Sequence, residues 1–332
     1  MCALVALAFT SCKKNQSNGT LTFEASITQP QSNDRTWVTA RNNLAWSMGD
    51  TILVFDANAA HNEFTVDKLS GTGSDLKQHA TFVVEDAKKD FMNAIATPKS
   101  YSAFYPHASF DDVNNKVSMT IPSTQYYDFD PSDGGHFGSF VTNTYPMFGV
   151  NDAAYHFQFH SHAGILEFQF GCEENRIVRV SRILVTSDDP LVGTMVYDYK
   201  YPVDSVYRPT DDVYTVNSTA TRVELMCSND TLSYYELPQP VGGINYQRFD
   251  IALLRGALAN GFHVTVYGYK NDPVSFGPVG SEEIILLDRE VPASIDNINV
   301  NNTIEAEKIT SMMRLILPAY GPGEGDGTPH NN

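Results

Sequence analysis

Little in this sequence supports nucleic-acid binding or a membrane-spanning helix. Among 332 residues only four are cysteine and two are tryptophan, and acidic residues outnumber basic ones by 39 to 22. The formal net charge of −17 would repel nucleic acid and anionic membrane surfaces, so we expect neither as a partner. Beyond the N-terminal segment, no apolar run approaches the roughly 18 residues that a spanning helix needs.

Catalytic and metal-binding motifs are also missing. The sequence contains no Gly-x-Ser-x-Gly, no His-Glu-x-x-His and no phosphate-binding loop. His156, His160 and His162 form a cluster, but residues four apart on an extended strand lie roughly 13 Å apart, too far to share one ion. The alternating acids of residues 128–133 resemble the start of a calcium loop that lacks its closing Glu. We therefore expect no enzyme, no cofactor and no metal site.

Cysteine usage leaves two thiols in the body of the chain. Cys2 and Cys12 belong to the N-terminal segment, and only Cys172 and Cys227 follow it. These two form either one disulfide, which an oxidising envelope would allow, or two buried thiols on strands. Neither lies in a Cys-x-x-Cys motif, so zinc binding and redox chemistry have no support.

The first twelve residues have the pattern of a secretory signal. Ten of them are apolar, two small residues precede Cys12, and a polar segment begins directly after it. A short apolar segment with small residues before the cut is typical of a signal peptide. With Cys after the cut, the pattern resembles a bacterial lipobox, in which the thiol is acylated. We expect a signal peptide over residues 1–11, lipid attachment at Cys12 as the only membrane contact, and a lipidated tether over residues 12–19.

In the rest of the chain, apolar residues alternate with polar ones in short segments. This period of two, the many β-branched and aromatic residues, and turns rich in Asn, Asp, Gly and Pro indicate packed antiparallel strands. The segments are 21–27, 51–55, 80–84, 116–121, 155–160, 164–170, 177–185, 222–226, 249–253, 262–268, 283–287 and 313–317. Only residues 86–96 and 302–312 have a pattern that allows a turn or two of helix. The sequence therefore predicts an all-β protein.

The length of the chain exceeds what one ordinary hydrophobic core supports. Turn residues at 149–153 separate two strand-rich halves. We expect two antiparallel β-sandwich domains in tandem, over residues 20–154 and 155–320, and a disordered tail over residues 321–332. Five large apolar side chains should lie mainly in the cores: Trp46, Phe55, Phe104, Phe168 and Leu184.

Several motifs of the first 200 residues occur in an order that resembles one protein family. They are 44–55 with its Trp-x-x-Gly-Asp turn, 101–106, 121–125, 157–168, 184–187 and 191–193. Their order and spacing resemble the fimbrillin-like lipoproteins of the Bacteroidetes, which are subunits of type V pili and their relatives. The resemblance implies transthyretin-like sandwich domains and a non-enzymatic, structural or adhesive role in a fimbria at the outer membrane and cell surface.

The resemblance also implies an assembly route with other pilus subunits as partners. In polymerising fimbrillins, an arginine-specific protease removes the first strand, and a strand of another subunit fills the groove by β-strand addition. Here Arg35 and Arg41 follow the predicted strand of residues 21–27. Arg35, flanked by Asn, Asp and Thr, is the better processing candidate, and an ordinary exposed loop arginine is the alternative.

A second function is also open at this point, that of a surface lipoprotein that binds host or glycan ligands and never polymerises. Such a protein would need an exposed aromatic platform, for which Tyr126, Tyr127 and Tyr145 are the candidates. For a pilus component, the sequence is compatible with a stalk, a tip or an anchor subunit.

Overall fold

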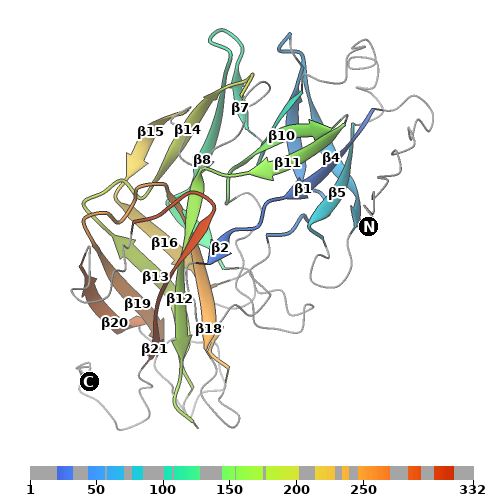
Figure 1. Cartoon of the computed structure of the whole chain (residues 1–332). Helices are drawn as coiled ribbons and strands as arrows, with labels where there is room; N and C mark the ends of the chain where they lie inside the picture. Colours follow the sequence, from blue (N-terminus) through green and yellow to red (C-terminus); the bar gives the residue numbers. More distant parts are fainter. Residues whose placement is uncertain are drawn as a thin grey trace, which may run out of the picture.

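The computed structural model describes residues 21–32, 44–56, 58–70, 77–84, 101–106, 108–127, 144–153, 155–174, 177–201, 214–228, 234–238, 246–269, 283–292 and 303–317. Over these residues the chain is built of strands (Figure 1), which confirms the predicted all-β class. In the described part of the chain, no helix is long and apolar enough to cross a membrane.

Seven strands close into a barrel in the order β1-β11-β10-β6-β3-β4-β5, drawn from blue to green in Figure 1. They are β1 (Thr22–Ile27), β3 (Thr51–Phe55), β4 (His61–Ser70), β5 (His79–Val84), β6 (Ser102–Tyr105), β10 (Met147–Ala153) and β11 (His156–His160). All neighbours are antiparallel except β1 and β11, which are parallel. The alternating pattern of the strands fits a sandwich and a barrel equally, because either arrangement buries one face of each strand.

Three open sheets make up the rest of the described chain. One has the order β18-β12-β21-β2, one β20-β19-β13-β16-β9 with β17 beside β13, and one β15-β14-β8-β7. Their strands are β2 (Gln31–Ser32), β7 (Ser109–Asp111), β8 (Lys116–Ile121), β9 (Thr124–Tyr126), β12 (Ala163–Gly171), β13 (Arg179–Thr186), β14 (Val192–Asp198), β15 (Tyr214–Ala220), β16 (Arg222–Met226), β17 (Tyr235–Glu236), β18 (Gln247–Leu254), β19 (Phe262–Tyr269), β20 (Glu283–Val291) and β21 (Lys308–Ile316). Phe168 of β12 contacts Phe262 of β19 with ring centroids 6.4 Å apart, so two of these sheets pack face to face.

Hydrogen bonding crosses the predicted domain boundary at residue 154 in several places. β1 pairs with β11, β8 with β14, and β9 with β16. The strands of residues 1–154 therefore have part of their pairing partners beyond that position. The division into residues 20–154 and 155–320 stays a prediction.

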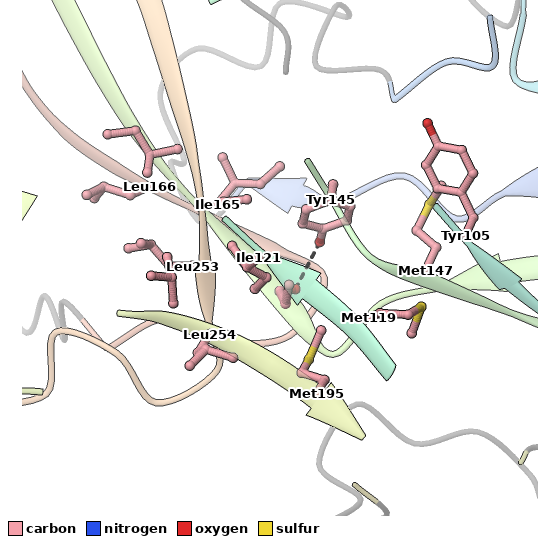
Figure 2. Close-up of a cluster of buried hydrophobic side chains, with 14 of the residues drawn as sticks. Tyr105, Met119, Ile121, Tyr145, Met147, Ile165, Leu166, Met195, Leu253 and Leu254 are labelled. Carbon is pink, nitrogen blue, oxygen red and sulfur yellow. Dashed lines mark hydrogen bonds between the residues drawn. The ribbon is translucent and has the colours of Figure 1, made fainter. Parts of the chain in front are cut away.

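A single hydrophobic cluster joins the barrel to the open sheets. Figure 2 shows its central part, where side chains of the barrel strands β6 and β10 lie near those of β8, β12, β14 and β18. The labelled residues are Tyr105, Met119, Ile121, Tyr145, Met147, Ile165, Leu166, Met195, Leu253 and Leu254. Because this apolar contact is continuous, the barrel and the sheets support each other rather than packing as isolated units.

The predicted core positions are confirmed with one exception. Trp46, Phe55, Phe104 and Phe168 are buried, whereas Leu184 is only half-buried. In β13 the side chains of Ile183 and Val185 are buried, and Leu184, which lies between them in the sequence, points to the opposite face. This error arose because both faces of β13 carry apolar residues, so alternation alone does not fix which face is inward.

The two segments with a helix-compatible pattern have different outcomes. Residues 302–312 were expected to allow a helical turn, and this expectation is wrong because β21 begins at Lys308 and pairs in parallel with β12. The second segment, residues 86–96, lies outside the described residues, as does the predicted tail over residues 321–332.

Candidate functional site: the first strand and the groove it fills

The first strand of the chain is fully integrated in the barrel. β1 runs parallel to β11 on one side and antiparallel to β5 on the other. Its backbone is bonded on both edges: the amide of Glu24 donates to the carbonyl of Tyr155 at 2.8 Å, and the amide of Ile27 donates to that of Gln78 at 3.2 Å. Without β1, the barrel would have two open edges, each with a row of unpaired backbone groups.

The inner face of β1 is the apolar one that the sequence predicted. Phe23, Ala25 and Ile27 are buried, and Leu21, just before the strand, is half-buried. The ring of Phe23 is held by three other rings, which belong to Phe64, Tyr101 and Phe157 at centroid distances of 5.0, 5.1 and 5.0 Å. Burial raises the pKa of Tyr101 to about 12, so this pocket is uncharged at neutral pH.

Trp46 packs in the barrel core against residues of the two strands that flank β1. Its fully buried ring packs edge-on against Phe82, Tyr105 and Phe159, with centroids 5.0, 5.2 and 5.1 Å away. Phe82 is the ladder partner of Phe23, and Phe159 is that of Ile27. Trp46 therefore contacts the ladder neighbours of Phe23 and Ile27, the two inward residues of β1 on either side of Ala25.

The turn after Trp46 holds that ring in place. The Asp50 carboxylate accepts a hydrogen bond from the Ser47 amide at 2.8 Å and one from the Tyr105 hydroxyl at 3.2 Å. Burial raises the pKa of Asp50, while these two hydrogen bonds oppose the rise. Gly49 has φ of +94°, a left-handed conformation that glycine adopts without strain. The predicted Gly-Asp turn is confirmed, and its role is to position the tryptophan.

The outer face of β1 makes polar contacts with β11. The Ser26 hydroxyl donates to Oε1 of Gln158 at 2.5 Å, and Nε2 of Gln158 donates to the Thr28 hydroxyl at 2.8 Å. Both ends of one amide are thus bonded to successive outward hydroxyls of the first segment. This arrangement fixes the register of β1 against β11.

Beyond β1 the same segment reaches the neighbouring sheet. The Gln29 side chain donates to the Leu44 carbonyl at 3.0 Å and accepts from the Leu44 amide at 2.7 Å. The chain then forms β2, which pairs in parallel with β21. Arg35 and Arg41 follow β2 and precede Leu44, outside the described residues. The segment 22–32 therefore completes two sheets before the chain reaches either arginine.

The three histidines do not gather into one site. His156 Nε2 lies 3.4 Å from the Ser26 hydroxyl, His160 Nδ1 lies 2.8 Å from Glu307 Oε1, and the buried His162 has Nδ1 3.2 Å from the Tyr197 hydroxyl. Among the described residues, no group of three or more His, Cys, Asp or Glu side chains could hold a metal ion. The acids of residues 128–133 lie outside that part of the chain.

The aromatic platform that a ligand-binding protein would need is not formed by its three candidate residues, because two of them are not exposed. Tyr126 is 50% exposed, but Tyr127 and Tyr145 are buried. The Tyr145 hydroxyl donates to the Ala163 carbonyl at 2.9 Å, and the Gln247 amide donates to the Tyr127 hydroxyl. Both phenols satisfy their polar groups inside the core, so they are unavailable for stacking against a ligand.

Cys172 and Cys227 are both buried, and no disulfide joins them. Burial raises the pKa of both Cys172 and Cys227, so neither is a reactive thiolate at neutral pH. The structure thus has the buried-thiol arrangement, one of the two that the sequence allowed. Cys12 lies outside the described residues.

No protein-family model matches the chain, and no curated protein matches it. Among solved structures, it is similar to a candidate cell adhesion protein from Bacteroides ovatus ATCC 8483, with 12% identity and a TM-score of 0.40 over 82% of this chain and 88% of that one. A candidate cell adhesion protein from Bacteroides fragilis NCTC 9343 has 10% identity and a TM-score of 0.39 over 87% and 91%. A tip fimbrial protein from Porphyromonas gingivalis has 10% identity and a TM-score of 0.23 over 80% and 82%. These values are too low to assign this chain a family or a role.

Proposed function

We propose that this chain is a structural or adhesive subunit of a cell-surface pilus, secreted as a lipoprotein and joined to other subunits by exchange of its first strand. The observation that supports the proposal is the position of β1. It is the first strand of the described chain, it completes a barrel, and Arg35 and Arg41 follow it closely. A cut after Arg35 would separate both β1 and β2 from the rest of the protein.

Loss of that segment would leave a groove with a strong preference for a new strand. Backbone groups on β5, β11 and β21 would lose their partners, and the contacts of Phe23, Ala25 and Ile27 would be exposed. Each large apolar side chain contributes roughly 1.5–3 kcal/mol by burial, so several kcal/mol depend on this strand. A strand from another subunit would restore the hydrogen bonds and the apolar contacts together.

Limited proteolysis tests the processing step. Trypsin at low dose should cut the folded protein first at Arg35 or Arg41, because the flanking strands are held by sheet hydrogen bonds while these arginines lie between them. The cut protein should form ladders on SDS gels that are run without boiling. The double variant Arg35→Ala, Arg41→Ala should resist both cleavage and laddering, and Arg222→Ala, in β16, should behave as the parent.

Two results would count against this assembly route. One is a folded protein that trypsin leaves intact between residues 32 and 44. The other is a protein that is cut there and stays strictly monomeric, which would favour a surface lipoprotein that binds ligands without polymerising.

Cell fractionation tests the lipid anchor. Replacing Cys12 by alanine should move the protein from the membrane fraction to the soluble one, because the thiol is the proposed acylation site. Cys172→Ala, which removes a buried thiol of the fold, should leave the protein with the membrane. A Cys12→Ala variant that still sediments with membranes after a high-salt wash would show that the anchor lies elsewhere.

A further inference from the structure

The shape of the groove under β1 restricts which strand can fill it. We infer that the groove selects a partner strand by its side chains at the positions of residues 23 to 28. In order, these side chains are aromatic, of any kind, small, hydroxyl-bearing, aliphatic and hydroxyl-bearing. The small side chain at position 25 has the largest effect on the fit. The inference rests on the proposed function, since it describes the occupant that would replace the first segment. The occupant is an extended segment of another polypeptide chain, lying parallel to β11 and antiparallel to β5 as β1 does.

The first position of the pattern is set by an aromatic pocket. Phe23 is fully buried among Phe64, Tyr101 and Phe157, at centroid distances of 5.0 to 5.1 Å. Interiors are packed closely enough that a smaller side chain would leave a void at this position. An aromatic residue of the partner strand would fill the pocket and regain the edge-to-face contacts with the rings of Phe64 and Tyr101.

The third position holds a small residue in a closely packed part of the barrel. Ala25 has ladder partners Ala80 on β5 and Phe157 on β11, and it is 1% exposed. The Trp46 ring contacts Phe82, the ladder neighbour of position 23, and Phe159, the ladder neighbour of position 27, so the rings on both sides of position 25 are already packed. The facing residue on β5 is also alanine. A larger residue at position 25 would have to displace these rings and the tryptophan packed against them, or push the strand away from its neighbours.

The outer face sets the register through Gln158. Its carbonyl oxygen accepts from the hydroxyl of Ser26, and its amide donates to that of Thr28, at 2.5 and 2.8 Å. A slip by one residue would place apolar side chains outward and leave this amide without hydroxyl partners. Hydroxyl residues at the fourth and sixth positions therefore align a partner strand with the pockets beneath it.

Peptide exchange into the full chain tests this selection. A specific protease site placed between Ser32 and Leu44 is cut, and labelled peptides with the sequence of residues 20–32 are offered to the nicked protein. Fluorescence anisotropy then gives the affinity of each peptide. The peptide with Ala25→Leu should bind about 5- to 150-fold more weakly than the parent sequence, the equivalent of an overpacking cost of about 1–3 kcal/mol. Glu24→Leu makes the matched control, because Glu24 points outward and is exposed. Its affinity should stay within about twofold of the parent.

The outcomes separate this inference from the proposal on which it rests. If the parent peptide fails to enter the nicked protein, strand exchange itself is wrong. If the parent peptide enters and the Ala25→Leu peptide binds equally well, exchange stands and the selection at position 25 is overturned. A protein variant with Trp46→Leu should recover binding of the Ala25→Leu peptide. Should that variant not fold, the comparison of the two leucine peptides on the unchanged protein still decides.

Discussion

Replacing Phe23 by alanine is expected to lower the free energy of unfolding by about 3–5 kcal/mol, the usual cost of truncating a fully buried phenylalanine. The ring is completely buried and contacts three aromatic side chains, those of Phe64 in β4, Phe157 in β11 and Tyr101 just before β6. Its removal would leave a cavity that rigid neighbouring rings cannot fill. Urea unfolding at neutral pH, followed by tryptophan fluorescence of the parent and the variant, measures the difference.

The neighbouring residue supplies the control for this substitution. Glu24 lies on the same strand but is exposed, so Glu24→Ala should change stability by no more than about 0.5 kcal/mol. A loss below about 1 kcal/mol for Phe23→Ala would mean that the strand is not packed inside the barrel. The groove would then lack its apolar pocket, and the argument for strand exchange would lose its main physical support.

Local sequence pattern was sufficient to locate many of the strands. β3, β8 and β16 have the bounds that alternation predicted, and β1 differs by one residue. The signal was strong where one face is apolar and turn residues follow at once. β4, β10, β14 and β15 were missed. In β15 the reason is that five of seven residues are exposed, so no apolar face marks the strand.

Sequence pattern could not predict which strands pair. The contacts of β1 with β11 join residues 130 positions apart, as between Ser26 and His156. No local feature marks a parallel pairing of this kind, since alternation reports only that one face is buried. The closed barrel was missed for the same reason, and so were the strand pairs that join residues before position 154 to residues after it.

The candidate site was predicted in part. Alternation identified Leu21, Phe23, Ala25 and Ile27 as the inner face; the last three are buried, and Leu21 is half-buried. The position of Trp46 could not be predicted from sequence, because it depends on contacts with Phe82 and Phe159 from two other strands. The hydrogen bonds of Gln158 with the hydroxyls of Ser26 and Thr28 could not be predicted either, because they depend on the parallel register of β11 against β1.

A second large effect is expected from a largely buried charged cluster on β12 and β18, whose side chains are 3% to 13% exposed. Glu167 and Asp250 face each other directly in the ladder, and the guanidinium of Arg248 contacts both. The Glu167 carboxylate also accepts hydrogen bonds from Gln169 and Ser311, at 2.6 and 3.0 Å. Asp250 has the poorer environment, because its contact with the guanidinium is 3.6 Å long. Burial first, and then the facing Glu167 carboxylate, raise the pKa of Asp250 to about 7, against the opposing effect of Arg248.

The consequence is a stability that falls as the pH rises. Between the ordinary pKa of 3.8 and the raised pKa of about 7, the folded protein holds a proton on Asp250 that the unfolded chain has released. The contribution of Asp250 to the free energy of unfolding therefore falls as the pH rises from 3.8 to about 7, and it falls no further above that pH. With about 1.4 kcal/mol for each unit of pKa, the loss is on the order of 2 to 4 kcal/mol.

Replacing Asp250 by asparagine should remove this fall. The variant and the parent should be similarly stable near pH 4, where the carboxyl is neutral, and the variant should be the more stable near pH 8. Urea unfolding at several pH values measures both curves, and Asp112→Asn, at an exposed turn position, should leave the slope of the parent unchanged. If Asp250→Asn instead destabilises the protein at pH 8, the charged carboxylate is needed by Arg248, and the cluster is held together as an ion pair rather than by a shared proton.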